Sequence, residues 1–168
     1  MPRRDTAFPE DTAAERRRLP PLARLVRFGE THVGRGVFAR RPLRSGMILA
    51  EVEGRILVEP PADSSYVMEL GSGRLLDPAA PLRFVNHSCD PNCELFYWEE
   101  DARNFEDDRL WLQTIRPIAA GEELSIDYAW PADAAIACRC RAVNCRGWIV
   151  DPAELDQIVP SRDPGAGT

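Results

Sequence analysis

The chain contains no lysine, because all 21 of its basic residues are arginine. Schiff-base chemistry and lysine general-base catalysis are therefore excluded for its own side chains. An enzyme of this composition that modifies lysine also has no lysine of its own to modify. A genome that favours arginine codons is the simplest explanation, and we expect a bacterial source.

Long hydrophobic runs are also missing. No stretch approaches the roughly 20 apolar residues of a membrane span, and Met1 to Asp5 lack the apolar core of a secretory signal. We therefore expect a cytoplasmic protein with no membrane association. In a reducing compartment, clustered cysteines hold metal more often than they form disulfides.

The chain has fewer basic than acidic residues, and its formal net charge is −6 at pH 7. A general nucleic-acid binder needs a basic face that displaces counterions, so no direct nucleic-acid partner is expected. The same negative charge favours a basic peptide or protein segment as a partner.

The length of 168 residues suits one domain. Short β-prone runs separated by Gly and Pro predict a mainly β fold. Residues 119–122 are predicted to form a tight turn, and the acidic stretch 99–108 a solvated hairpin loop. The predicted strands cover residues 25–28, 36–39, 47–52, 56–58, 66–70, 74–76, 94–98, 110–115 and 123–127.

One persuasive helix is predicted, near the C-terminal end. Asp151 can cap it, Pro152 fits its first position, and Glu154 lies where a capping box needs a carboxylate. Leu155 and Ile158 would then form one apolar face.

Four of the five cysteines form a pattern that fits a metal site. Cys138, Cys140 and Cys145 lie close together, and Cys89 lies far upstream. Four thiolates suit a closed tetrahedral structural zinc site, which would tie the C-terminal segment to the middle of the chain. A site with three cysteines and one histidine, in which His87 replaces Cys89, is the alternative. The remaining cysteine is expected to be a small buried hydrophobe.

Four segments occur together in one order, and that order resembles the SET-domain family of S-adenosylmethionine-dependent protein lysine methyltransferases. The segments are Gly34–Ala39, Arg83–Cys89, Gly121–Tyr128 and the terminal cysteine cluster, which the family calls post-SET. The resemblance implies a SET-domain β-fold of several small sheets with a pseudoknot-like C-terminal segment, a post-SET zinc motif and a short C-terminal helix. The implied parts are a flexible lead-in (1–21), the SET domain (22–133), the post-SET zinc motif (134–150), and the C-terminal helix and tail (151–168).

The resemblance also implies which residues bind S-adenosylmethionine. A Gly-x-Gly segment would cradle its methionine part, since glycine lets the backbone approach a ligand closely. The Asn86 side chain and the His87 backbone would hold its amino-acid and adenine ends, and Trp148 would close over it. The implied cofactor-binding residues are Gly34, Arg35, Gly36, Tyr66, Arg83, Phe84, Asn86, His87 and Trp148.

By the same resemblance, Tyr128 is the catalytic tyrosine, whose hydroxyl orients the transferring methyl group. Two residues of the implied substrate channel depart from the family pattern. Val52 stands where many relatives have a tyrosine that contacts the substrate amine, and Ile126 stands where they usually have Phe or Tyr. These changes would widen and dry the channel, which predicts multiple methylation of lysine or a different amine substrate.

Two other functions fit the same residues. A binding module could keep the fold and the zinc but lack catalysis, as the changes at Val52 and Ile126 allow. A nucleophilic enzyme could use Cys89 and His87, provided that a third group orients the base. Zinc ligation by Cys89 would exclude the nucleophilic enzyme.

Overall fold

The computed structural model describes residues 3–4, 19–62, 65–70, 73–98 and 109–158. Most of the predicted lead-in, the predicted acidic loop at 99–108 and the tail from residue 159 onward lie outside the described residues. The chain divides into two compact units. Unit 1 comprises residues 1–86 and 91–126, and unit 2 comprises residues 87–90 and 127–168.

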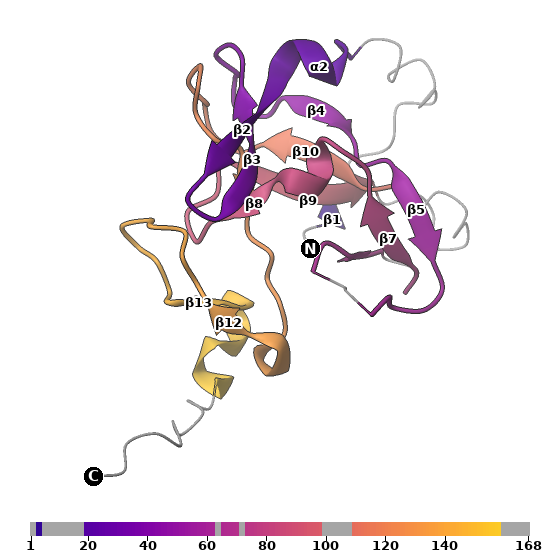
Figure 1. Cartoon of the computed structure of the whole chain (residues 1–168), viewed down its shortest axis with the longest axis vertical. Coiled ribbons are helices and arrows are strands. Elements are labelled where there is room, and N and C mark those ends of the chain that lie inside the picture. Colours follow the sequence, from indigo (N-terminus) through magenta and orange to yellow (C-terminus); the bar gives the residue numbers. More distant parts are fainter. Residues whose placement is uncertain (1–2, 5–18, 63–64, 71–72, 99–108, 159–168) are drawn as a thin grey trace. The chain divides into compact units, whose positions relative to one another are not determined.

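The largest sheet of unit 1 has four strands in the order β1-β9-β10-β4 (Figure 1). β10 is antiparallel to both of its neighbours, whereas β1 runs parallel to β9. All four residues of β10 are buried, so both faces of this strand are covered. The strands are β1 (Arg3–Arg4), β4 (Ile48–Glu51), β9 (Cys93–Trp98) and β10 (Trp111–Thr114).

Smaller sheets complete unit 1. A two-residue loop joins β2 to β3, because Thr31 pairs with Gly34 across the hairpin. A three-stranded sheet has the order β5-β7-β6, and β8 pairs with β11. The bounds are β2 (Val26–Thr31), β3 (Gly34–Ala39), β5 (Gly54–Leu57), β6 (Met68–Glu69), β7 (Leu75–Pro78), β8 (Asn86–His87) and β11 (Ser125–Ile126).

Two short helices link these sheets. The α-helix α2 (Leu22–Leu25) packs against β4, and the 3-10 helix η1 (Leu82–Phe84) contacts both β3 and β7. Because η1 contacts two sheets, it brings the residues that follow β7 beside the Gly-x-Gly segment of β3.

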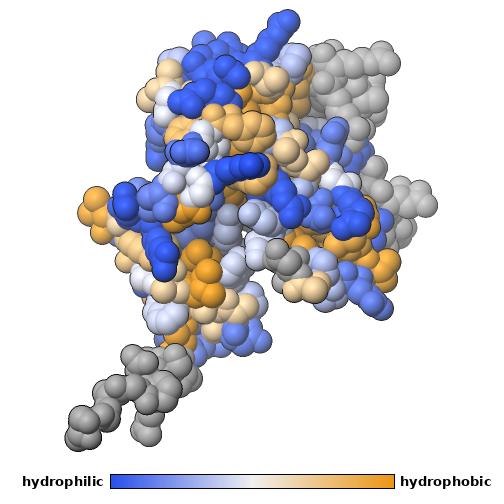
Figure 2. All heavy atoms as spheres, in the orientation of Figure 1, coloured by the Kyte–Doolittle hydropathy of each residue, from blue (hydrophilic) through white to orange (hydrophobic). Residues whose placement is uncertain are grey.

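The core of unit 1 is mostly apolar, and the buried amide of Asn92 forms its hydrogen bonds within it. Phe96, Leu49 and Leu112 are at most 1% exposed. Asn92 is also 1% exposed, but its side chain donates to the carbonyl of Glu123 and accepts from the N–H of Ser125. Hydrophilic and hydrophobic side chains are interspersed on the face of the molecule seen in Figure 2.

The mainly β prediction is confirmed, and each of the nine predicted strands overlaps an observed one. The predicted turn at 119–122 is confirmed as well, since the N–H of Glu122 donates to the carbonyl of Ala119. Gly121 adopts a φ of 83° there, a conformation that favours glycine. The sequence did not predict α2, η1 or the two-residue strands β1 and β8.

Unit 2 contains little regular structure. Its elements are the 3-10 helix η3 (Ala132–Ala134), the antiparallel pair β12 (Ile136–Ala137) and β13 (Trp148–Ile149), and the 3-10 helix η4 (Pro152–Gln157). Cys89 and Val150 are the buried apolar residues among those described in this unit.

The predicted C-terminal helix is present as η4, with Asp151 as its N-cap, and the side chain of Asp151 accepts from the N–H of Ala153 at 2.8 Å. The prediction of a complete capping box is wrong. Glu154 accepts from the N–H of Ala132, and the N–H of Asp151 donates to the carbonyl of Trp130 instead. The predicted apolar face is also wrong, because no residue of η4 is buried and Leu155 is 37% exposed.

None of the helices in the described part of the chain is long and apolar enough to cross a lipid bilayer.

Candidate functional site

An aromatic cluster lies where η1 meets the β2–β3 hairpin in unit 1. The ring of Phe84 makes edge contacts with Phe28 and Tyr66, at centroid distances of 5.7 and 6.2 Å. The guanidinium of Arg35 lies 5.4 Å from the Phe84 centroid, and that of Arg83 lies 4.2 Å from the Tyr66 centroid. Four predicted cofactor residues thus gather in one place, together with Phe28, which the sequence did not single out.

This cluster is open to solvent, because Phe28 is 51% and Tyr66 38% exposed. Exposed aromatic rings flanked by guanidinium groups offer flat apolar surface and positive charge side by side. The carboxylate of Asp77 forms an ion pair with Arg83 and holds it in place. The surface therefore suits a ligand that has both a flat ring and a carboxylate.

Gly36 and Asn86 form a tight junction next to this cluster. The amide nitrogen of Asn86 donates to the carbonyl of Arg35 at 2.9 Å and to Oε1 of Glu123 at 2.7 Å. A Cβ on Gly36 would lie 2.5 Å from Cγ2 of Thr31 and 2.6 Å from Oε1 of Glu123, so a larger residue would force these side chains to move. The two hydrogen bonds fix the orientation of the Asn86 amide.

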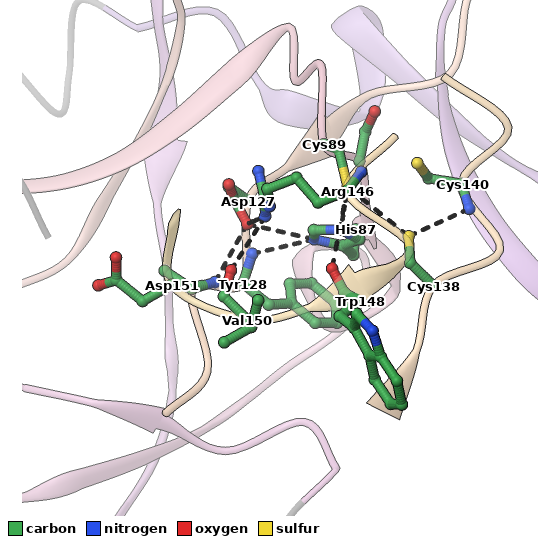
Figure 3. Close-up of polar contacts among 12 residues, drawn as sticks. His87, Cys89, Asp127, Tyr128, Cys138, Cys140, Arg146, Trp148, Val150 and Asp151 are labelled. Atoms are coloured by element: carbon green, nitrogen blue, oxygen red, sulfur yellow. Dashed lines mark hydrogen bonds and ion pairs between the residues drawn. The ribbon is translucent and has the colours of Figure 1, made fainter. Parts of the chain in front are cut away.

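The cysteine sulfurs of unit 2 lie at the spacing of a metal site. Sγ of Cys89 is 3.8 Å from Sγ of Cys138 and 4.0 Å from Sγ of Cys145. A tetrahedral zinc with Zn–S bonds of about 2.3 Å requires sulfurs about 3.8 Å apart. We call Cys89, Cys138, Cys140 and Cys145 the thiol cluster (Figure 3 labels three of them).

Backbone amides point at these sulfurs. The N–H groups of Cys140, Arg146 and Gly147 donate to the sulfurs of Cys138, Cys89 and Cys145, each at 3.4 Å. Such bonds favour the thiolate form that a metal needs. The residues present therefore fit a structural zinc ion.

The pKa values of two thiols in the cluster shift in opposite directions. Burial opposes ionisation of Cys140, but hydrogen bonds from the backbone of Cys89 and Ala142 and from the neighbouring thiols outweigh it and lower its pKa to about 6. Burial and the neighbouring thiols raise the pKa of Cys138 well above its usual range.

His87 is close to the thiol cluster, but not as the predicted alternative has it: the ligand atoms that lie within 4.8 Å of one another belong to His87, Cys89, Cys138 and Cys140, a set that keeps Cys89 and leaves out Cys145. Nε2 of His87 is 3.4 Å from Sγ of Cys89. However, Nδ1 accepts the N–H of Tyr128 at 3.2 Å and lies 3.4 Å from Oδ1 of Asp127, and the accepting role of Nδ1 leaves Nε2 as the nitrogen that can donate to Cys89. In that tautomer, Nε2 donates to Cys89 instead of ligating a metal, which favours the set of four cysteines.

Tyr128 is held by aromatic neighbours within unit 2. Its ring stacks on Trp130 at a centroid distance of 5.6 Å and lies 5.5 Å from the ring of His87. Asp127, just before it, accepts from Arg146 at 2.8 Å. The proposed catalytic tyrosine is thus in the same unit as the thiol cluster.

The other predicted residues lie as follows. Val52 and Ile126 are buried in unit 1, at 3% and 2% exposure, and their channel roles stay predictions. Trp148 is half-buried, and its carbonyl points toward the sulfurs while its indole points away (Figure 3). Cys93 is 1% exposed in unit 1, and burial raises its pKa to about 12, which confirms it as a buried hydrophobe.

A groove of about 360 Å³ lies elsewhere in unit 1, between residues 19–22, the β4 strand and residues 79–82. None of the predicted site residues lines it. The candidate site therefore rests on the aromatic cluster, the Gly36–Asn86 junction and the thiol cluster.

The sequence did not single out three polar residues that lie at these sites, Glu123, Asp127 and Arg146. Glu123 contacts Asn86, and Asp127 pairs with Arg146. Glu123 and Asp127 fall inside a segment quoted for the resemblance, but their partners are distant in the sequence. Only the structure shows these pairings.

Comparison with known proteins identifies the family of these motifs. The family model described as "SET domain" matches residues 34–129. Histone-lysine N-methyltransferase ash1 of Drosophila melanogaster is 31% identical over 153 residues, which cover 80% of this chain and 7% of that protein. Histone-lysine N-methyltransferase Su(var)3-9 of Drosophila pseudoobscura pseudoobscura is 32% identical over 143 residues, which cover 67% of this chain and 23% of that protein.

A solved structure supports the same assignment. The crystal structure of KRYPTONITE in complex with mCHG DNA and SAH is similar with a TM-score of 0.60 and 25% identity. The match covers 71% of this chain and 27% of that one. The chain therefore spans a small part of the relatives that it matches.

Proposed function

This chain belongs to the SET-domain family, and we propose that it is an S-adenosylmethionine-dependent methyltransferase that acts on lysine side chains of a protein. The two sequence relatives are named histone-lysine N-methyltransferases, and the KRYPTONITE structure contains SAH. The observation that carries the proposal is the convergence of the aromatic cluster and the Gly36–Asn86 junction on one surface of unit 1.

Different residues of unit 1 suit different chemical groups of S-adenosylmethionine. The rings of Tyr66 and Phe84 provide a stacking surface, and the guanidinium groups of Arg35 and Arg83 provide positive charge for a carboxylate. Because its nitrogen is already bound, the amide of Asn86 presents its oxygen as an acceptor for an ammonium group. When bound, S-adenosylmethionine supplies an electrophilic methyl group on a positively charged sulfonium.

The chain needs no strong base for this reaction. The substrate lysine must be neutral, although its ordinary pKa is about 10.4. Desolvation and a nearby positive charge both disfavour the ammonium form. We propose that Tyr128 then orients the reacting groups by a polar contact from its hydroxyl, so that alignment supplies most of the rate enhancement.

We propose that the thiol cluster holds a structural zinc through Cys89, Cys138, Cys140 and Cys145. The sulfur spacing and the N–H groups directed at the sulfurs support this ligand set. Bound zinc would supply folding energy to the C-terminal segment. With Cys89 committed to zinc, nucleophilic catalysis by Cys89 and His87 is not part of the proposal.

The substrate is proposed to be a basic, lysine-containing protein segment, in keeping with the net charge of −6. The same charge supports a function without direct nucleic-acid binding. We further propose a cytoplasmic location, because a reducing compartment keeps clustered thiols available for metal. A bacterial source is supported by the arginine-only basic set, whereas the two named sequence relatives come from flies.

Calorimetry and methyl transfer test the proposal together. The wild-type chain should bind S-adenosylmethionine and transfer a radiolabelled methyl group to some member of a panel of basic proteins. Asn86→Ala should weaken cofactor binding about tenfold or more, because it removes the oriented amide. Tyr128→Phe should bind the cofactor almost normally and turn over more slowly.

Two results would change the conclusion. A chain that binds no S-adenosylmethionine would be a binding module that keeps the fold. Equal turnover by the wild type and Tyr128→Phe would show that the hydroxyl is idle.

The residues at positions 52 and 126 lead to a separate prediction about how many methyl groups the product carries. Val52 and Ile126 remove a hydroxyl and an aromatic ring that many relatives have, so we propose that more than one methyl group is added to each lysine. Mass spectrometry of the methylated substrate should show di- or trimethyl-lysine, and a product that stays monomethylated would refute this part.

A further inference from the structure

Two hydrogen-bonded chains connect Cys89 of the thiol cluster to the Asp127–Tyr128 dipeptide, and both lie entirely within unit 2 (Figure 3). One chain passes through the side chain of His87. The other passes through both the backbone and the side chain of Arg146. Neither side chain has a metal-binding or cofactor-binding role in the proposed function.

The first chain uses both nitrogens of one imidazole. The N–H of Tyr128 donates to Nδ1 of His87 at 3.2 Å. Nε2 of the same ring lies 3.4 Å from Sγ of Cys89, and Nδ1 also lies 3.4 Å from Oδ1 of Asp127. The His87 side chain is 3% exposed, so packing holds the ring between its two partners.

The second chain uses the two ends of one arginine. The backbone N–H of Arg146 donates to Sγ of Cys89 at 3.4 Å. Its Nη2 donates to Oδ1 of Asp127 at 2.8 Å and to the carbonyl of Val150 at 3.1 Å. The side chains of Arg146 and Asp127 are only 14% and 23% exposed, so this ion pair is shielded from solvent more than a surface pair.

The charges of the second chain suit the thiol cluster. Four thiolates and one divalent cation together carry a net negative charge, and Arg146, whose backbone N–H contacts Cys89, brings a positive guanidinium to this part of unit 2. Asp127 in turn fixes that guanidinium. Partners of metal ligands that are arranged in this way typically change metal affinity about 10- to 100-fold when they are mutated.

We propose that His87 and Arg146 are positioning residues that couple metal binding at the thiol cluster to the placement of Tyr128. Because coupling between two sites is reciprocal, changes at Asp127 must weaken metal binding, although Asp127 is not in the thiol cluster. The link to catalysis rests on the proposed function. The coupling itself can be measured on the metal and on one amide, without turnover.

The first test measures the zinc affinity of the full-length chain by competition with a chromophoric chelator. Arg146→Gln removes the ion pair and keeps the backbone N–H that points at Cys89, and we expect zinc to bind about tenfold more weakly or worse. Arg141→Gln removes the same charge from an exposed residue between the ligands and should have a much smaller effect. Equal losses in the two variants would overturn the proposal, because they would show a charge effect without the specific chain.

A double-mutant cycle tests whether Arg146 and Asp127 act as one unit. Asp127→Asn alone should weaken zinc binding. Asp127→Asn combined with Arg146→Gln should then bind zinc no more weakly than Arg146→Gln alone. Unchanged affinity in Asp127→Asn, or losses that simply add, would overturn the second chain.

Two substitutions separate the two ends of the imidazole. His87→Asn can keep an acceptor near the position of Nδ1, and His87→Gln can keep a donor near that of Nε2. In zinc-loaded protein, amide hydrogen exchange at Tyr128 should be faster in His87→Gln than in His87→Asn, whereas zinc affinity should be lower in His87→Asn. Identical behaviour of the two variants would overturn the first chain, and unchanged exchange in the core of unit 1 verifies that each variant is folded.

Kinetics connects the coupling to the proposed function. At saturating zinc, Arg146→Gln should lower kcat while the KM for S-adenosylmethionine stays close to that of the wild type. If zinc affinity and exchange at Tyr128 respond as expected but kcat does not, the coupling stands and the proposed catalytic role of Tyr128 fails.

Discussion

Different interactions stabilise the interior of each unit. Unit 1 has hydrogen-bonded sheets around fully buried residues such as Leu49 and Phe96. The described part of unit 2 buries little apolar surface beyond Cys89 and Val150, and its few elements are short. A segment with so small a core needs another source of stability, such as a structural metal ion, and the thiol cluster supplies the ligands for one.

This difference matters for function because the units carry different tasks. In the proposed function, unit 1 presents the cofactor surface and unit 2 presents Tyr128. The cofactor surface should then survive loss of the metal, whereas the placement of Tyr128 should not.

The largest expected effect comes from Cys140→Ser. Loss of one thiolate should release zinc and unfold unit 2 locally, because structural zinc binding is coupled to folding. Trypsin should then cut rapidly after Arg139 and Arg141, which metal analysis and mass spectrometry can follow. Cys93→Ala is the matched control, because it removes a buried thiol from unit 1 and should leave zinc bound. Full zinc content in Cys140→Ser would contradict the four-cysteine site.

A substitution in the core of unit 1 should lower the stability of unit 1 and leave zinc binding intact. Leu49→Ala removes a side chain that is fully buried in unit 1 and should cost about 2–5 kcal/mol of unfolding free energy, measured with denaturant. Zinc affinity should stay unchanged. The control Val58→Ala, at a residue that is 90% exposed, should shift stability by less than about 0.5 kcal/mol. A Leu49→Ala chain that lost its zinc would show that the units are not independent.

Gly36→Ala should have a smaller effect that is confined to unit 1. The added Cβ would collide with Thr31 and Glu123, and overpacking of this kind costs about 1–3 kcal/mol. Calorimetry should also show weaker binding of S-adenosylmethionine, because the junction with Asn86 is displaced. Normal stability together with normal cofactor binding would mean that the segment is merely a turn.

The smallest expected effect is at the N-cap of η4 in unit 2. Asp151→Ala removes the acceptor for the N–H of Ala153 and should cost about 1 kcal/mol, seen as faster exchange of the η4 amides. Asp133→Ala, at an exposed acidic residue of η3, is the control. Equal exchange in both variants would show that the cap contributes nothing.

The sequence predicted the strands of unit 1 well, because β-prone runs between glycines and prolines are a local signal. The turn at Gly121 and the cap at Asp151 were predicted for the same reason. The two-residue strands β1, β8, β12 and β13 and the helix η1 were not predicted, because such short pieces are set by their tertiary partners.

The parts of the site that the sequence missed depend on long-range partners. Glu154 was expected to complete a capping box, but it bonds to Ala132, which lies 22 residues away. The tautomer of His87 is set by the amide of Tyr128, 41 residues along the chain. No local pattern contains such pairings, so the sequence alone could not weigh four cysteines against three cysteines with one histidine.

Amide hydrogen exchange of the full-length chain, with zinc bound and after chelation, tests the contrast between the units most directly. The account predicts that residues 127–158 lose their protection on chelation, while β4, β9 and β10 exchange as slowly as before. Equal protection of residues 127–158 in both states, or loss of protection throughout the chain, would contradict it.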